Sequence, residues 1–176
     1  MWLHFLLPIG YSALFFTSFE SSQLYGLFVI GIFAGFGFLQ IDRVIHAFFI
    51  DPEHEFSVAL QQAWRERRPV FFIKLLLQAQ TMQQRLMTRS VLFMLTYIAL
   101  TLYVLTSTGS ALGAGFMLGL GLHYCLDLWL YQRDVTLFHE HFLWQLKRQL
   151  AVQEVRSLLA AFTVFFIMMS LLVLVQ

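Results

Sequence analysis

Residues 111–131 read ALGAGFMLGLGLHYCLDLWLY, an apolar run that carries one histidine and one aspartate. A helix that crosses a bilayer needs roughly 20 mostly apolar residues, and this run has that length. It lacks the strict alternation of polar and apolar residues that a barrel strand requires. The run therefore predicts a membrane-spanning helix, and the rest of the chain has the same character.

The composition of the whole chain excludes an ordinary soluble domain. Of the 176 residues, 59% are hydrophobic and only 12% are charged, whereas soluble domains are about 45–50% apolar and about 25% charged. So few charges could not cover a surface that faces water. A disordered chain and a disulfide scaffold are excluded as well, the latter because the chain has a single cysteine. We therefore expect an integral membrane protein.

Five apolar segments define the expected architecture. They cover residues 2–19, 24–41, 90–106, 111–131 and 158–175. Backbone groups in lipid must bond within their own segment, which favours helices. The fold class is therefore all-α and polytopic, with about five transmembrane helices in a single transmembrane domain over residues 1–176. The first segment is the weakest of the five, because Pro8 and Gly10 interrupt it.

Two long polar connectors, residues 51–89 and 132–157, separate spans 2 from 3 and 4 from 5. In the first, Phe56, Leu60 and Trp64 recur at helical spacing. A second helix is expected from Val70 through Gln84 into the third span. The later connector has its own apolar stripe, formed by Phe138, Phe142, Leu146 and Leu150. Both patterns predict amphipathic helices that lie at the membrane surface or pack on each other.

All cations of the chain lie between residues 43 and 89 or between 133 and 156, and the two short connectors have none. With five spans, both long connectors fall on one side, and the positive-inside rule makes that side cytoplasmic. We therefore expect the N-terminus and both long loops in the cytoplasm and the C-terminus outside. The basic run at residues 65–68 is too short for a nucleic-acid site and suits anionic lipid headgroups.

The second and fourth spans share a small-residue pattern. Gly31 and Gly35 are four residues apart, as are Gly115 and Gly119, and each pair is followed by an aspartate. Small residues at this spacing let helix backbones approach closely. We expect these four glycines to pack the two spans together at the centre of the protein. The pattern also indicates a weak parallel repeat that relates residues 24–107 to residues 111–175.

Ionisable residues inside a membrane are costly and mark functional sites or internal partners. Asp42 and His46 are four residues apart on the second span, and His123 and Asp127 are four apart on the fourth. Each pair therefore shares a helix face. If the two spans pack together, the four side chains form a cluster open to the cytoplasm. Histidine with carboxylate suits a divalent metal such as zinc, iron or manganese, so the cluster is a candidate metal site. Two other interpretations stay open: structural Asp–His and Asp–Arg contacts that fix the helix register, and a proton or ion relay.

No catalytic motif assigns a reaction. His139 and Glu140 do not begin an H-E-x-x-H helix, because His141, Phe142 and Leu143 follow them. We expect a small non-enzymatic membrane protein, either a transporter- or channel-like module or a subunit of a membrane complex. Two alternatives stay open: a metal-dependent membrane enzyme acting on a lipid-like substrate, and a scaffold whose cytoplasmic helices dock a protein partner. A homo-oligomer through a glycine-rich face is also left open.

Overall fold

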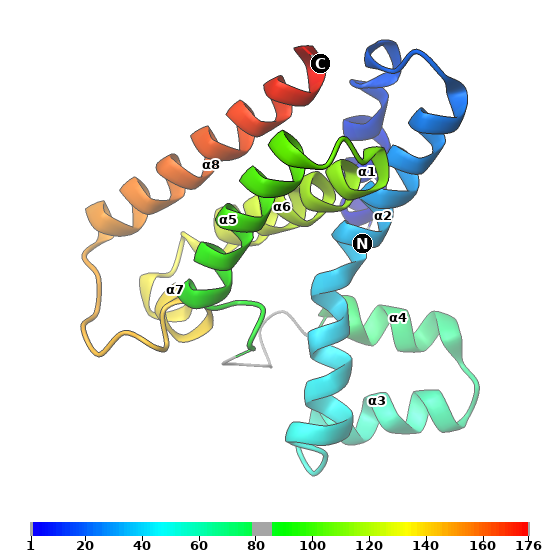
Figure 1. Cartoon of the computed structure of the whole chain (residues 1–176). Helices are drawn as coiled ribbons and strands as arrows, with labels where there is room; N and C mark the ends of the chain where they lie inside the picture. The colour runs from blue at the N-terminus through cyan, green and yellow to red at the C-terminus, as the bar shows by residue number, and fades with distance from the viewer. Residues whose placement is uncertain (1, 79–85, 176) are drawn as a thin grey trace.

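The computed structural model describes residues 2–78 and 86–175, which form helices joined by short loops, with no strand in those ranges (Figure 1). The elements are α1 (Trp2–Ala13), the 3-10 turn η1 (Phe16–Ser18), α2 (Ser22–Ile45) with its π-helical extension η2 (His46–Ile50), α3 (Glu55–Arg65), α4 (Pro69–Gln78), α5 (Val91–Ser107), α6 (Ala111–Tyr131), α7 (Val135–Phe142) and α8 (Val152–Val175). The all-α prediction is confirmed.

Within residues 2–78 and 86–175, three helices are long and apolar enough to cross a membrane. They are α2 with η2, at 29 residues, α6, at 21 residues, and α8, at 24 residues. Helix α5 has 17 residues, at the lower limit for a span. Helix α1 has only 12 residues, about 18 Å at 1.5 Å per residue, against a hydrocarbon core of about 30 Å. The described part of the chain is thus helical, with three helices that can span a membrane, and the predicted count of five spans is not confirmed.

Helices α2 and α6 form the central pair, and they run in the same direction. A Cβ atom built on Gly31 or Gly35 would come within 3.0 Å of the backbone of α6, and one built on Gly115 or Gly119 would come equally close to the backbone of α2. Only glycine lets the two backbones approach this closely. The parallel course of α2 and α6 is what a parallel repeat requires, although the repeat itself stays a prediction.

Aromatic side chains pack α5 and α8 against α6. The rings of Tyr97 on α5 and Tyr124 on α6 both contact Phe162 on α8, with centroid distances of 5.7 and 5.6 Å. Helix α1 packs at the other end of the bundle, where the Tyr11 hydroxyl lies 2.6 Å from Ser170 Oγ on α8. The bundle therefore holds together around α6, the helix whose sequence first predicted the fold.

The two long connectors fold differently from each other. The first forms an antiparallel hairpin of α3 and α4, at the lower right of Figure 1. Phe56 and Leu60 of α3 are buried with Ala47 of η2 in a small apolar cluster that attaches the hairpin to the end of α2. The predicted continuation of the second connector helix through Gln84 falls on residues 79–85, outside the described residues.

The later connector does not form one long amphipathic helix. Helix α7 begins after Asp134, whose carboxylate accepts hydrogen bonds from the backbone N–H groups of Thr136 and Leu137, and it ends at Phe142. Leu143 is fully buried, and the chain turns there. The predicted stripe is therefore wrong beyond Phe142, because the chain leaves the helix in order to bury Leu143, and Leu146 is exposed.

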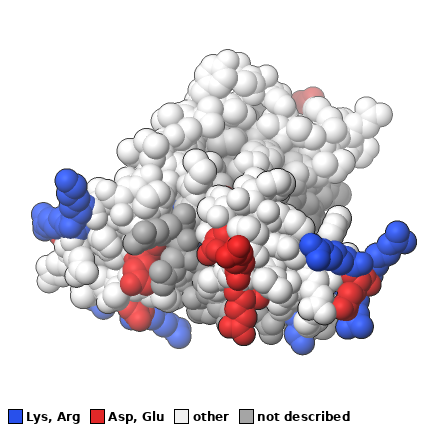
Figure 2. Space-filling view, turned by 90° about the horizontal axis from the view of Figure 1, so that it is seen from below, with Lys and Arg blue, Asp and Glu red and all other residues white. Residues whose placement is uncertain are grey.

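Charged groups gather at one end of the bundle. Figure 2 views the molecule from the end that holds the α3–α4 hairpin and α7, with Lys and Arg mostly toward the two sides of this face and Asp and Glu between them. The opposite end includes Ser18, Gly109, Ser110 and Val173, which line one hollow together with Glu20. The structure thus places the short connectors and the C-terminal end of α8 together, away from the long polar connectors.

Candidate functional site: a buried ionic network

Asp127 lies at the centre of a buried network of charged side chains. Its position on α6 faces the segment that leads into α5, and both Nε and Nη2 of Arg89 donate hydrogen bonds to its Oδ2 atom, at 2.8 and 2.6 Å. The side chains of Arg89 and Asp127 are 1% and 0% exposed. In this buried pair, the positive charge of the guanidinium compensates the negative charge of the carboxylate.

Asp42 is bonded to the residue next to Arg89. Its Oδ2 atom accepts hydrogen bonds from the backbone N–H of Thr88, at 2.8 Å, and from the Thr88 hydroxyl, at 2.9 Å. The Thr88 carbonyl in turn accepts a hydrogen bond from the Tyr124 hydroxyl on α6. Residues 88 and 89 therefore join the lower ends of α2 and α6, which both carry a carboxylate at this level.

Arg43 adds a second buried guanidinium, from α2. Its Nη1 atom donates to the Leu76 carbonyl of α4, at 2.7 Å, and to the Gln40 side chain, at 3.0 Å. Its charge also interacts with those of Asp127 and Asp42. Arg43 therefore connects the hairpin to the same network that holds α2 and α6.

His123 lies one helical turn above Asp127. Its Nδ1 atom is 2.5 Å from the Phe36 carbonyl of α2, and a carbonyl only accepts, so Nδ1 carries the hydrogen. The imidazole also stacks on the Phe36 ring, with a centroid distance of 4.5 Å. Its Nε2 atom lies 3.7 Å from Asp127 Oδ1. This histidine therefore bridges the two central helices from within the core.

Of the four predicted cluster residues, the structure brings together Asp42, His123 and Asp127, but not His46. Asp42 and Asp127 contact adjacent residues of that segment, and His123 lies beside Asp127. His46 begins η2, further down α2, and its buried Nδ1 atom has no hydrogen-bond partner among the described residues. Across residues 2–78 and 86–175, no group of three or more His, Cys, Asp or Glu side chains is arranged to hold a metal ion.

Sequence reasoning missed Arg89 as a site residue, because it counted this arginine among the cations of a polar connector. Ser90 accepts a hydrogen bond from Phe93 N–H and caps the start of α5. Arg89 therefore directly precedes a buried helix start, and its side chain turns into the bundle. Burial lowers the pKa of Arg89, but the charge of Asp127 and the hydrogen bonds to it raise the pKa above its usual value overall. The sequence did contain a signal for this role: Arg89 directly precedes the apolar run of residues 90–106, and that run contains no Asp or Glu.

Comparison with known proteins gives no assignment. No protein-family model, no curated protein and no solved structure matches the chain.

Proposed function

We propose that the protein is a non-enzymatic membrane module in which the buried ionic network is structural, and that it acts as a subunit or scaffold presenting the α3–α4 hairpin at the membrane surface. The observation that carries the proposal is the engagement of Asp127, whose Oδ2 atom accepts two hydrogen bonds from Arg89. A carboxylate already paired with a guanidinium is a poor ligand for a metal and a poor general base.

The position of the network supports a joining role. Asp127 and Asp42 bind adjacent residues of the segment before α5, while Arg43 binds a carbonyl of α4. One cluster thus connects α2, α6, α5 and the hairpin. Arg89 and Asp127 are an ion pair of opposite charges, and removing one member of a buried pair is costly. A network of this kind fixes helix register and holds a surface element in place.

The close α2–α6 crossing also favours a module without a conduit between these two helices. A Cβ atom on any of the four crossing glycines would meet backbone of the facing helix. Packing this tight leaves no room for a water-filled path along that seam. The transporter- or channel-like interpretation therefore receives less support than the subunit interpretation, and the metal-dependent enzyme receives less support than either.

The proposal includes an orientation. The cationic end of the bundle faces the cytoplasm, in keeping with the preference of Lys and Arg for cytoplasmic loops. The hairpin then lies at the inner membrane surface, where a soluble or membrane-bound partner can reach it.

The test is reconstitution of the full chain into liposomes, with two measurements. Dyes report the flux of protons and of K⁺ or Na⁺, and elemental analysis reports bound divalent metal. We expect no flux above that of protein-free liposomes and no stoichiometric metal. Flux that disappears in a folded Asp127→Asn variant would overturn the proposal in favour of transport. Stoichiometric metal lost in the same variant would overturn it in favour of the metal-dependent alternative. Glu154→Gln is the matched control, because its carboxylate is outside the network and pairs with Arg148 at the surface.

A further inference from the structure

The α3–α4 hairpin has one face attached to the bundle and another that is open. Phe56 and Leu60 are buried on the attached side, and the Gln61 side chain donates to the Ala47 carbonyl of η2, at 2.9 Å. On the open side, Trp64 is 64% exposed and Val70 is 80% exposed. Soluble surfaces do not leave a tryptophan and a neighbouring apolar helix this exposed without a partner.

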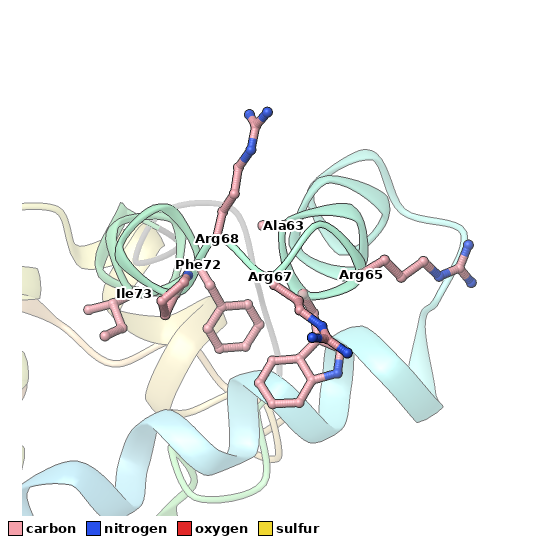
Figure 3. Close-up of a pocket in the computed structure, with 8 residues that line it drawn as sticks. Ala63, Arg65, Arg67, Arg68, Phe72 and Ile73 are labelled. Atoms are coloured by element: carbon pink, nitrogen blue, oxygen red, sulfur yellow. The ribbon is translucent and has the colours of Figure 1, made fainter.

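The open side contains a hollow of about 730 Å³ between the two helices. Apolar side chains and arginines line it, namely Ala63, Trp64, Arg65, Arg67, Arg68, Pro69, Phe72 and Ile73. Figure 3 shows Phe72 and Arg67 pointing to the same side of the hairpin, while Arg65 and Arg68 extend in other directions. The Trp64 and Phe72 rings are in contact, with a centroid distance of 5.5 Å. The hollow thus combines an aromatic floor with a cationic rim.

The charge of this rim is positive. Three arginines surround the hollow, and one carboxylate, that of Glu66, lies 3.1 Å from Arg68 Nε. Three positive charges and one negative charge leave a balance of +2. A second hollow of about 390 Å³ adjoins Arg68 and is lined by Val70, Phe71 and Lys74 as well. An apolar run at the start of α4 is therefore flanked by a cation on each side, Arg68 before it and Lys74 after it.

Arg67 adopts a backbone conformation that usually belongs to glycine. Its φ angle is +53°, and its N–H and that of Arg68 donate to the Trp64 and Ala63 carbonyls, which closes the end of α3. This C-terminal cap favours glycine because other residues are strained there. Arg67 is therefore strained in this position, and its guanidinium lies at the mouth of the hollow, where a glycine would have no side chain.

We propose that this hollow binds an anionic phospholipid, with the lipid phosphate at Arg67 and an acyl chain against Trp64 and Phe72. Arg65 and Arg68 add long-range attraction. The lipid is favoured over a protein segment because the hairpin is attached to the end of a helix long enough to span the bilayer. Headgroups and the upper part of acyl chains meet at that level, where tryptophan also concentrates. The proposal rests on the cytoplasmic orientation given under the proposed function.

The test uses the full chain in a neutral detergent and two short-chain lipids, dihexanoyl phosphatidylglycerol and dihexanoyl phosphatidylcholine. Native mass spectrometry counts bound lipid as each is titrated. We expect the anionic lipid to bind more tightly and Arg67→Gly to weaken it about fivefold, the effect of one surface cation. Arg67→Gly removes the strained conformation, so it keeps or raises the melting temperature, and misfolding cannot explain the loss. Arg133→Gln, at an exposed arginine outside the hairpin, is the matched control and should bind like wild type.

Two further arms identify the bound group. Trp64→Ala should weaken both lipids by the same factor, because it removes apolar contact and no charge. Inorganic phosphate should compete only weakly, because it has no acyl chain. Equal binding of the two lipids, wild-type binding by Arg67→Gly, or full competition by phosphate would each overturn the proposal. None of these outcomes bears on liposome flux or bound metal, so the two proposals can fail separately.

Discussion

Arg89 and Asp127 are 38 residues apart in the sequence, yet two nitrogen atoms of the arginine donate to a single carboxylate oxygen of the aspartate, at 2.8 and 2.6 Å. One residue precedes α5 and the other lies near the end of α6, so the pair fixes how these helices meet. The Asp42–Thr88 bonds beside it fix α2 to the same segment. The lower end of the bundle is therefore held by charge, whereas the middle is held by glycine contacts.

The first prediction concerns this buried pair. Arg89→Met should lower the free energy of unfolding by about 3–5 kcal/mol, because it removes the guanidinium that donates two hydrogen bonds to the buried Asp127 carboxylate. The double variant Arg89→Met/Asp127→Leu should recover most of that loss, since two apolar side chains of similar size need no compensation. The measurement is unfolding of the purified protein in detergent by titration with sodium dodecyl sulfate, followed by circular dichroism.

A surface ion pair provides the control for this cycle. Arg148 and Glu154 are 2.7 Å apart, but their side chains are 75% and 40% exposed. Arg148→Met should change the free energy of unfolding by less than about 1 kcal/mol. If Arg89→Met were as mild as Arg148→Met, or if the double variant were no more stable than the single one, the network would not have the structural role proposed.

The sequence predicts the helical bundle and its central pair because both depend on local patterns. Apolar runs of sufficient length specify helices in lipid, and glycines four residues apart specify where two of them cross. The partner of Asp127 depends instead on a long-range contact. His46 was expected in the cluster because it lies four residues from Asp42. Helical spacing, however, cannot predict that Arg89 comes from another segment and pairs with Asp127.

Helix lengths were harder to predict for similar reasons. The first apolar segment contains enough residues to span, but α1 ends at Ala13 and the chain turns through η1 before α2 begins. Pro8 lies inside α1, so it does not cause the ending. The stripe predicted from Phe138 to Leu150 has helical spacing as well, and the burial of Leu143 outweighs it. At the end of α7, tertiary packing therefore decides where the helix stops.

The glycine crossing gives a prediction with a control on the same helix. A Cβ atom on Gly35 would meet the backbone of α6, whereas one on Gly37 has nothing within 4 Å. Gly35→Ala must push two backbones apart and should lower the free energy of unfolding by about 3 kcal/mol, the upper end for overpacking. Gly37→Ala should leave it unchanged or raise it by up to about 1 kcal/mol, because alanine favours the helix. The measurement is the free energy of unfolding of both variants in detergent. Equal changes in the two variants would contradict the close crossing of α2 and α6.

The hydroxyl of Thr88 offers a milder test of the network. Thr88→Val keeps the shape of the side chain and the backbone N–H bond to Asp42 but removes the hydroxyl donor. A hydrogen bond to a charged group contributes about 1.5–3 kcal/mol, so we expect a loss of that size. Thr96→Val is the control, since its exposed hydroxyl bonds only to the Leu92 carbonyl of its own helix. A loss as small as that of Thr96→Val would mean that Asp42 does not depend on this contact.

The arrangement of the two ends can be tested by labelling in intact cells. In a Cys125→Ala background, single cysteines replace Arg67, Lys147 and Glu20, all of which are exposed. A maleimide that cannot cross membranes should label the cysteine at position 20 in intact cells, and those at positions 67 and 147 only after permeabilisation. This is expected because the long connectors lie at one end of the bundle, with Glu20 at the other. Labelling of positions 67 and 147 from opposite sides would contradict the fold. Labelling of both from outside would leave the fold intact and reverse the orientation, and the hairpin would then face the outer leaflet.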